Sequence, residues 1–271
     1  MLTDPFTPQW ITWLDAQAAG LQDTQQLYLL LDGVFIPGLY RTMQRKMAPD
    51  QKPTLLFEAL PSCNDKTRDV SPFLLAYRGQ PQLSKLLSAC SGWPMVSAIV
   101  TTESAEQLGR RLAAWCVVEA DSQRFNFRFP DTRRLPGIFN ALTGEQRAML
   151  CGPASTWFYI GRNGDWATLD VPQVMAPLAE SPTLEAGQFG VMVDDSEADG
   201  MLARFDYRGL QWQQPHSTIH ALVQQGLKVA AHNQLDSDLW LDWCAAYIDQ
   251  SLLTDTAEAA RQFPQWKAQY Q

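Results

Sequence analysis

Three charged side chains near the middle of the chain have types and a spacing that could do chemistry. Arg128, Asp131 and Arg133 lie in the run RFNFRFPDTRR, which covers residues 124–134. A carboxylate between two guanidinium groups is held in its ionised form and binds a proton less readily. Such a carboxylate is a poor general base, and no histidine or cysteine adjoins it in the sequence. We therefore predict that these residues form a structural clamp and not a catalytic site.

Two other patterns could bind a metal ion. His216 and His220 are four residues apart on a predicted helix, with His232 further along. No carboxylate lies at helical spacing to supply a third zinc ligand, so we favour ordinary helix-end histidines. The run from Asp195 to Asp206 is similar to a calcium loop, but its acidic residues do not fit the loop's ligand positions. We expect an acidic helix junction there, and no metal or other cofactor.

Aromatic side chains near the C-terminus could instead hold a protein partner. The candidates for partner binding are Trp240, Trp243, Trp266 and Tyr270. Aromatic residues on a small helical lobe either build its core or anchor a partner. The core is the favoured place for Trp240 and Trp243, whereas Trp266 and Tyr270, close to the chain end, are better candidates for partner contacts.

Composition and charge exclude several classes of function. The chain has 271 residues, a hydrophobic content of 46% and a net charge of −8. Residues 184–271 hold five Lys/Arg and twelve Asp/Glu, a charge of −7 that repels nucleic acid and anionic lipid. No apolar run approaches the ~20 residues of a membrane helix, and the first residues lack the features of a signal peptide. We therefore expect neither a nucleic-acid nor a membrane partner.

The cysteines indicate a reducing compartment. There are five, an odd number, and they are widely spaced with no C-x-x-C pair. This pattern is typical of buried thiols in the cytoplasm and not of a disulfide framework or a zinc site. We predict a cytoplasmic protein.

The clamp needs local elements to position it. Phe125, Phe127 and Phe129 alternate with polar residues, which predicts a strand with one buried face. Pro130 cannot donate a ladder hydrogen bond and should end the strand. Thr143 and Gln146 match a capping box that predicts a helix from Gly144, and residues 152–153 (Gly-Pro) should end it.

The rest of the chain predicts an α/β lobe followed by a helical one. Expected strands are residues 27–31, 54–59, 93–101, 156–160 and 166–169, and expected helices are residues 8–19, 38–47 and 82–90 and one that starts after Ser104. The predicted fold class is an α/β N-terminal lobe with a mixed sheet and flanking helices, plus a smaller, mainly α-helical C-terminal lobe. The boundaries are residues 1–172 for the α/β lobe, 173–183 for a proline-containing linker, and 184–271 for the acidic helical lobe. Within the last, residues 184–206 could be strand or helix, and we predict helix.

The clamp segment resembles a bacterial protein family. Arg128-Phe129-x-Asp131-x-Arg133, the following capping box, and Gly152-Pro153 with Trp157 are similar to the motifs of the type VI secretion effector-loading adaptors. The strand that begins at Leu27 resembles the same family. Thr132 stands where these adaptors usually have proline, so the geometry of this corner cannot be carried over from them.

The resemblance implies a non-enzymatic adaptor or chaperone. Such a protein binds the N-terminal segment of an effector toxin and loads it onto the spike (valine-glycine repeat) protein of the secretion machine. No nucleophile elbow, phosphate loop, zinc-protease helix or dinucleotide fingerprint is present in the sequence. Two alternatives remain open: an immunity-like protein that binds a toxin to neutralise it, and a hydrolase that uses Cys63 or the histidines in an unrecognised site.

Overall fold

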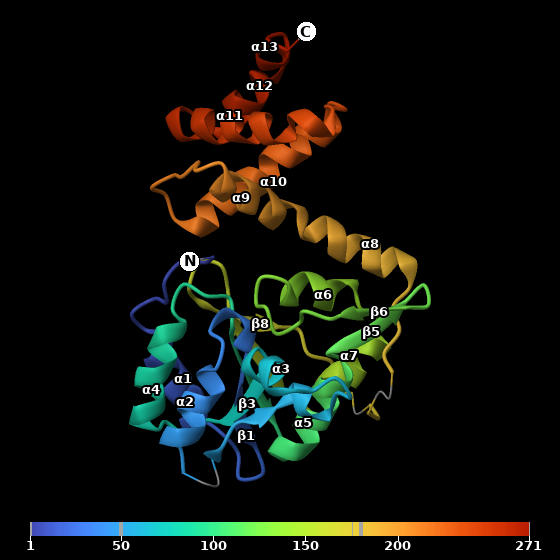
Figure 1. The fold of residues 1–271 in the computed structure, drawn as a ribbon. Coiled ribbons are helices and arrows are strands. Elements are labelled where there is room, and N and C mark those ends of the chain that lie inside the picture. The colour runs from blue at the N-terminus through green and yellow to red at the C-terminus, as the bar shows by residue number, and fades with distance from the viewer. Residues whose placement is uncertain (1, 49–50, 175, 179–180, 271) are drawn as a thin grey trace. The chain divides into compact units, whose positions relative to one another are not determined.

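The computed structural model describes residues 2–48, 51–174, 176–178 and 181–270. The chain forms two compact units, Met1–Met192 and Val193–Gln271. The first contains a sheet with flanking helices and the second is helical, which confirms the predicted fold class, although the sheet is antiparallel throughout and not a mixture of parallel and antiparallel strands (Figure 1). The division between the units lies later in the chain than the predicted linker over residues 173–183. The reason is that Leu184 and Phe189 pack against the core of the first unit.

A six-stranded sheet organises the first unit. Its strand order is β2-β3-β1-β4-β7-β8, and all pairings between these strands are antiparallel. In spatial order the strands are β2 (Thr54–Leu55), β3 (Phe73–Ala76), β1 (Gln26–Leu31), β4 (Val96–Thr101), β7 (Thr156–Ile160) and β8 (Trp166–Leu169). The two strands expected at residues 156–160 and 166–169 are confirmed and form an antiparallel hairpin, β7 with β8.

The central strand β1 is buried on both faces, as its unbroken apolar run predicts. Tyr28 and Leu30 contribute to one hydrophobic core, whereas Leu27, Leu29 and Leu31 contribute to the other. Alternate side chains of a strand point to opposite faces, so this one strand supports both layers of helices.

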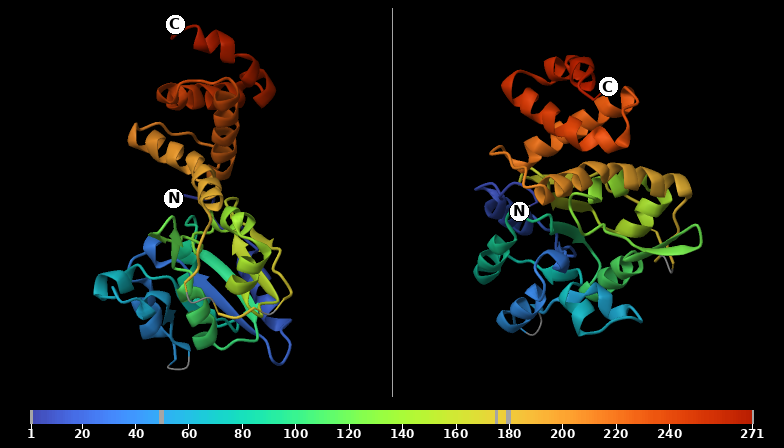
Figure 2. Two further views of the ribbon diagram at one scale, coloured as in Figure 1. Left: turned by 90° about the vertical axis from the view of Figure 1, so that its right-hand side faces the viewer. Right: turned by 45° about the horizontal axis from the view of Figure 1, so that its top comes forward.

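Helices cover both faces of the sheet (Figure 2). On one face lie α1 (Trp10–Ala19), α2 (Leu39–Lys46) and α4 (Pro81–Leu87), and on the other lie α5 (Ala105–Ala114), α6 (Leu135–Ala141) and α7 (Gly144–Cys151). The short helix α3 (Asp65–Asp69) precedes β3. The capping box predicted at Thr143 is present at the start of α7, and a second one at Ser104 begins α5, the helix expected after that residue.

The predicted strand over residues 54–59 is wrong beyond Leu55. Leu56–Ala59 forms a 3-10 helix, η3, instead. Leu56 N–H donates to the Pro72 carbonyl at 2.9 Å, and proline has no N–H with which to return a ladder bond. The next N–H, of Phe57, then donates to the Ser71 hydroxyl at 3.0 Å, so the strand pairing ends.

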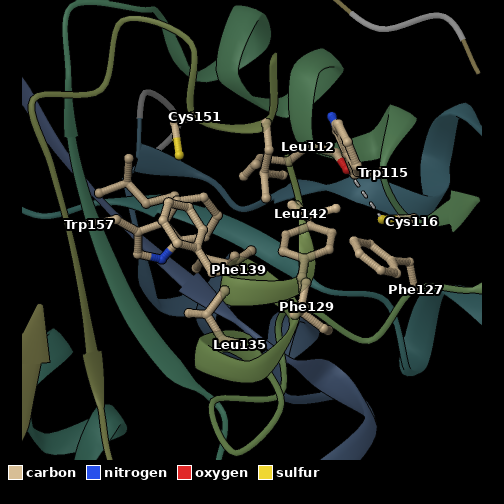
Figure 3. Close-up of a cluster of buried hydrophobic side chains, with 14 of the residues drawn as sticks. Leu112, Trp115, Cys116, Phe127, Phe129, Leu135, Phe139, Leu142, Cys151 and Trp157 are labelled. Carbon is tan, nitrogen blue, oxygen red and sulfur yellow. Dashed lines mark hydrogen bonds between the residues drawn. The ribbon is translucent and has the colours of Figure 1, made fainter. Parts of the chain in front are cut away.

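The strand predicted at residues 124–129 forms a separate hairpin, outside the main sheet. It pairs β6 (Gln123–Asn126) with β5 (Val117–Ala120). The alternation continues past the regular ladder: Phe127 and Phe129 are buried while Arg128 remains half exposed. Figure 3 shows Phe129 in the core with Phe139 and Trp157, and the ring of Phe129 meets that of Trp157 edge-on at 6.3 Å.

The second unit consists of the last residues of α8 (Ala186–Asp195) and the helices that follow it. They are α9 (Glu197–Tyr207), α10 (His216–His232), α11 (Trp240–Leu253), α12 (Thr256–Arg261) and α13 (Phe263–Lys267). The helical prediction for residues 184–206 is thus confirmed from Ala186 onward. Trp243 and Tyr247 of α11 pack against Gly226 of α10, where any larger side chain would press on the Tyr247 ring.

Candidate functional site: an arginine–aspartate corner

The predicted clamp residues gather at a corner beyond the end of β1. Asp32 follows the last residue of β1, and its N–H donates to the Met95 carbonyl at 3.0 Å. Arg128 reaches this aspartate from the segment after β6, with Nη2 2.9 Å from Asp32 Oδ2. The corner thus joins the central strand to the run that carries the motif.

Asp131 and Arg133 form the second ion pair of the corner. Arg133 donates from Nη2 to Asp131 Oδ2 at 2.8 Å and from Nε to Oδ1 at 3.1 Å, a bidentate geometry. Arg128 lies 4.0 Å from Asp131 Oδ2, so it bridges the two pairs weakly. The structure therefore brings Arg128, Asp131 and Arg133 together and adds Asp32. Sequence analysis did not single out Asp32; its sequence signal is its place directly after a buried strand and before Gly33.

The carboxylates of the corner are buried while one arginine faces solvent. The side chains of Asp32 and Asp131 are only 3% and 4% exposed, against 46% for Arg128. Burial raises the pKa of Asp32 above its ordinary value and outweighs the opposing effect of Arg128, and the charge of Asp131 raises it further. Both carboxylates have arginine partners, so the corner fits the structural clamp that the sequence predicts.

An aromatic ring lies beneath both guanidinium groups. The Cζ atoms of Arg128 and Arg133 are 5.8 and 5.7 Å from the ring centroid of Phe35. Both distances are within the range of cation–π contacts. Phe35 in turn contacts Trp93, with the centroids 6.1 Å apart. This stack extends the corner to the 3-10 helix Gly33–Phe35.

Backbone bonds fix the turn that presents Asp131. Thr132 N–H donates to the Pro94 carbonyl at 2.9 Å, a bond that proline at this position could not make. Arg133 N–H donates to Asp131 Oδ1 at 3.0 Å, and Leu135 N–H donates to the Asp131 carbonyl at 3.0 Å. Thr132 therefore ties this corner to the segment just before β4.

The cysteines and the calcium-like run give no support to the alternative chemical sites. Burial raises the pKa of the Cys90, Cys151 and Cys244 thiols to about 12, which disfavours the nucleophilic thiolate. Cys116 shifts in the same direction, while Cys63 is partly exposed. Three residues of the calcium-like run, Glu197, Asp199 and Asp206, lie within helix α9 and not in a loop, so the calcium-loop reading is wrong.

The predicted partner-binding aromatics differ in exposure. Trp243 is 2% exposed, and its Nε1 donates to the Gly226 carbonyl at 2.9 Å, so it is a core residue. Trp240 is partly buried and donates to the Leu235 carbonyl. Trp266 packs on Trp243 with centroids 5.1 Å apart, and Tyr270, 49% exposed, lies over Trp266 at 4.7 Å. Of these four residues, Tyr270 is the most accessible to a partner.

The three histidines lie along one helix, α10, in the described part of the chain. The histidines do not gather: His216 and His232 are exposed at opposite ends of α10, and His220 is buried between them. Over the described ranges, no three His, Cys, Asp or Glu residues are placed to hold a metal ion. Within the same ranges, none of the helices combines the length and the apolar character needed to cross a membrane.

Comparison with known proteins matches part of the chain to a family model. No curated protein and no solved structure matches the chain. Residues 27–149, from β1 into α7 and including all four residues of the corner, match the model of a family described as Domain of unknown function (DUF4123).

Proposed function

We propose that this chain is a non-enzymatic adaptor or chaperone of a bacterial type VI secretion system. It binds an effector toxin through the toxin's N-terminal segment and loads it onto the valine-glycine repeat spike protein. It acts in the cytoplasm, where its five cysteines remain thiols.

One observation carries the proposal. The family match over residues 27–149 covers the segment whose motif resembles the effector-loading adaptors, Arg128-Phe129-x-Asp131-x-Arg133. The family match and the motif resemblance therefore fall on the same part of the chain.

The geometry of the corner supports binding over catalysis. Asp131 is engaged by a bidentate Arg133 and Asp32 by Arg128, so neither carboxylate is poised as a general base. A buried clamp of this kind stabilises the fold that presents a binding surface.

Co-purification tests the proposal. The tagged full chain is expressed together with the products of the neighbouring reading frames, each of which is also tested alone. We expect capture of the full-length effector, loss of capture when the effector lacks its N-terminal segment, and a ternary complex when the spike protein is added.

The same experiment separates an adaptor from an immunity protein. An adaptor should leave the toxin's catalytic domain active in the complex, whereas an immunity protein should inhibit it. Failure to retain both the effector and the spike would refute the proposed function.

A further inference from the structure

The helical unit has an open pocket between α10 and α12. Its volume is about 350 Å³. The residues that line it are Lys228, Val229, His232, Asn233, Ala260 and Arg261. All of them belong to the second unit, so the pocket is a feature of that unit alone.

Basic side chains surround this pocket. Lys228 and His232 are four residues apart on α10 and so lie on one helix face, and Arg261 comes from α12. Arg261 donates from Nε and Nη2 to Glu258 Oε2, at 3.1 and 2.7 Å, which leaves its Nη1 available. Within the described part of the chain, the side chains of Lys228 and His232 form no hydrogen bond or ion pair. The charges of Glu258 and Asp255 both act on Arg261, so Lys228 is the cation of the pocket that no ion pair in the described part of the chain offsets.

The surroundings of the pocket have the opposite sign. Residues 193–271 hold five Lys/Arg and eleven Asp/Glu, and two of those five cations line the pocket. An acidic ligand is therefore repelled by most of the unit and attracted to this pocket. This difference favours one binding position over the others. The floor adds an apolar contact, because Val229 and Ala260 are partly buried against the core of the unit.

We propose that this pocket binds a carboxylate side chain next to an apolar side chain on the effector's N-terminal segment. The carboxylate pairs with Lys228 and the free edge of Arg261, and its apolar neighbour rests on Val229 and Ala260. This inference rests on the proposed function, because it names the surface that the effector uses.

Charge reversal at Lys228 tests the inference. The full chain and its Lys228→Glu variant are titrated with the purified N-terminal segment of the effector captured above. We expect affinity to fall at least 10-fold in the variant. For the wild-type chain, affinity should also fall as the salt concentration rises. The matched control is Lys267→Glu, which makes the same charge change on α13, outside the pocket lining, and should bind within about 2-fold of wild type.

Two further measurements separate a binding effect from a folding effect. The melting temperatures of Lys228→Glu and wild type should agree, because Lys228 is exposed on α10. The ring resonances of His232 should shift on titration of the wild-type chain and remain still in the variant. A change of an acidic residue to lysine in the effector segment should restore binding to Lys228→Glu.

The outcomes are distinguishable. If wild type binds the segment and Lys228→Glu binds equally well, the pocket assignment is overturned while the adaptor function stands. Equal losses in Lys228→Glu and Lys267→Glu would also overturn it, because net charge alone would then explain the effect. If wild type binds no effector, the proposed function fails and the pocket assignment fails with it.

Discussion

Arg128 Nη2 lies 2.9 Å from Asp32 Oδ2, although the two residues are 96 positions apart in the sequence. The bond fixes the segment that leaves β6 against the end of the central strand β1. Arg128 is also 4.0 Å from Asp131, which is itself held by Arg133. The corner is therefore a network of two ion pairs, with the exposed Arg128 adjoining two buried carboxylates.

Asp131→Ala should strongly destabilise the first unit. The substitution leaves Arg133, whose side chain is only 13% exposed, without its bidentate partner. Removing one partner of a buried ion pair costs several kcal/mol, so we expect the free energy of unfolding to fall by roughly 2–4 kcal/mol. Urea denaturation followed by tryptophan fluorescence measures the loss, and soluble yield should fall with it.

Asp65→Ala is the matched control for Asp131→Ala. Asp65 also pairs with an arginine, Arg68, but its side chain is 85% exposed. Exposed pairs contribute little, so stability should change by less than about 1 kcal/mol. If Asp131→Ala is as stable as wild type but no longer captures the effector, the corner is a contact site and the clamp interpretation is wrong.

Asp32 should make the stability of the first unit depend on pH in a defined direction. Its folded-state pKa is raised above the ordinary value of 3.8, chiefly by burial. As the pH rises past 3.8, the unfolded chain loses this proton before the folded chain does, so the contribution present at lower pH is lost. The loss is complete once the pH has passed the folded-state pKa.

Asp32→Asn isolates this effect. Denaturation of wild type and variant at matched pH values between about 3.5 and 7 gives the difference in unfolding free energy, with 3.8 as the ordinary pKa. We expect wild type to become less stable relative to the variant as the pH rises. A difference that is independent of pH, or that moves the other way, would show that Arg128 outweighs burial at this carboxylate.

Local sequence patterns predicted the elements around the corner better than the corner itself. The capping boxes at Ser104 and Thr143 depend on residues three positions apart, and both are present. The alternation of Phe127 and Phe129 likewise predicted which side chains are buried. Such features are decided within a few residues and can be read from one sequence.

The features that the sequence did not predict depend on contacts between residues that are far apart along the chain. Arg128 was expected to bind Asp131, yet its nearest carboxylate is Asp32, brought close only by the fold. The strand over residues 54–59 ends after Leu55 because of Pro72, which lies far along the chain. The basic pocket joins Lys228 and Arg261 from two helices, and no motif in the sequence connects them.

Gly152→Ala should destabilise the first unit because the position has no room for a Cβ atom. The residue has a φ of 56°, and an added Cβ would overlap the Arg111 guanidinium. Arg111 cannot readily move, because it is bonded to Glu103 at 2.7 Å and donates to the Met149 carbonyl. Strain and overpacking together should lower the free energy of unfolding by roughly 2–4 kcal/mol.

Gly144→Ala serves as the control for Gly152→Ala. Gly144 begins the same helix, α7, and nothing lies within 4 Å of an added Cβ. Alanine favours the helix, so this variant should be unchanged or more stable by up to about 1 kcal/mol. Equal stability of the two variants in thermal unfolding would contradict the steric argument.

Trp266→Ala and Tyr270→Ala should separate packing from partner binding at the C-terminal aromatics. Trp266 contacts Trp243 and Phe263, so its loss should lower the stability of the helical unit by roughly 2–3 kcal/mol. Tyr270 is 49% exposed and its removal should change stability by less than about 0.5 kcal/mol. If Tyr270 anchors a partner as predicted, Tyr270→Ala should weaken capture of the effector or the spike about 10-fold while the melting temperature stays constant. Unchanged capture of both partners would show that Tyr270 packs over Trp266 but does not contact a partner.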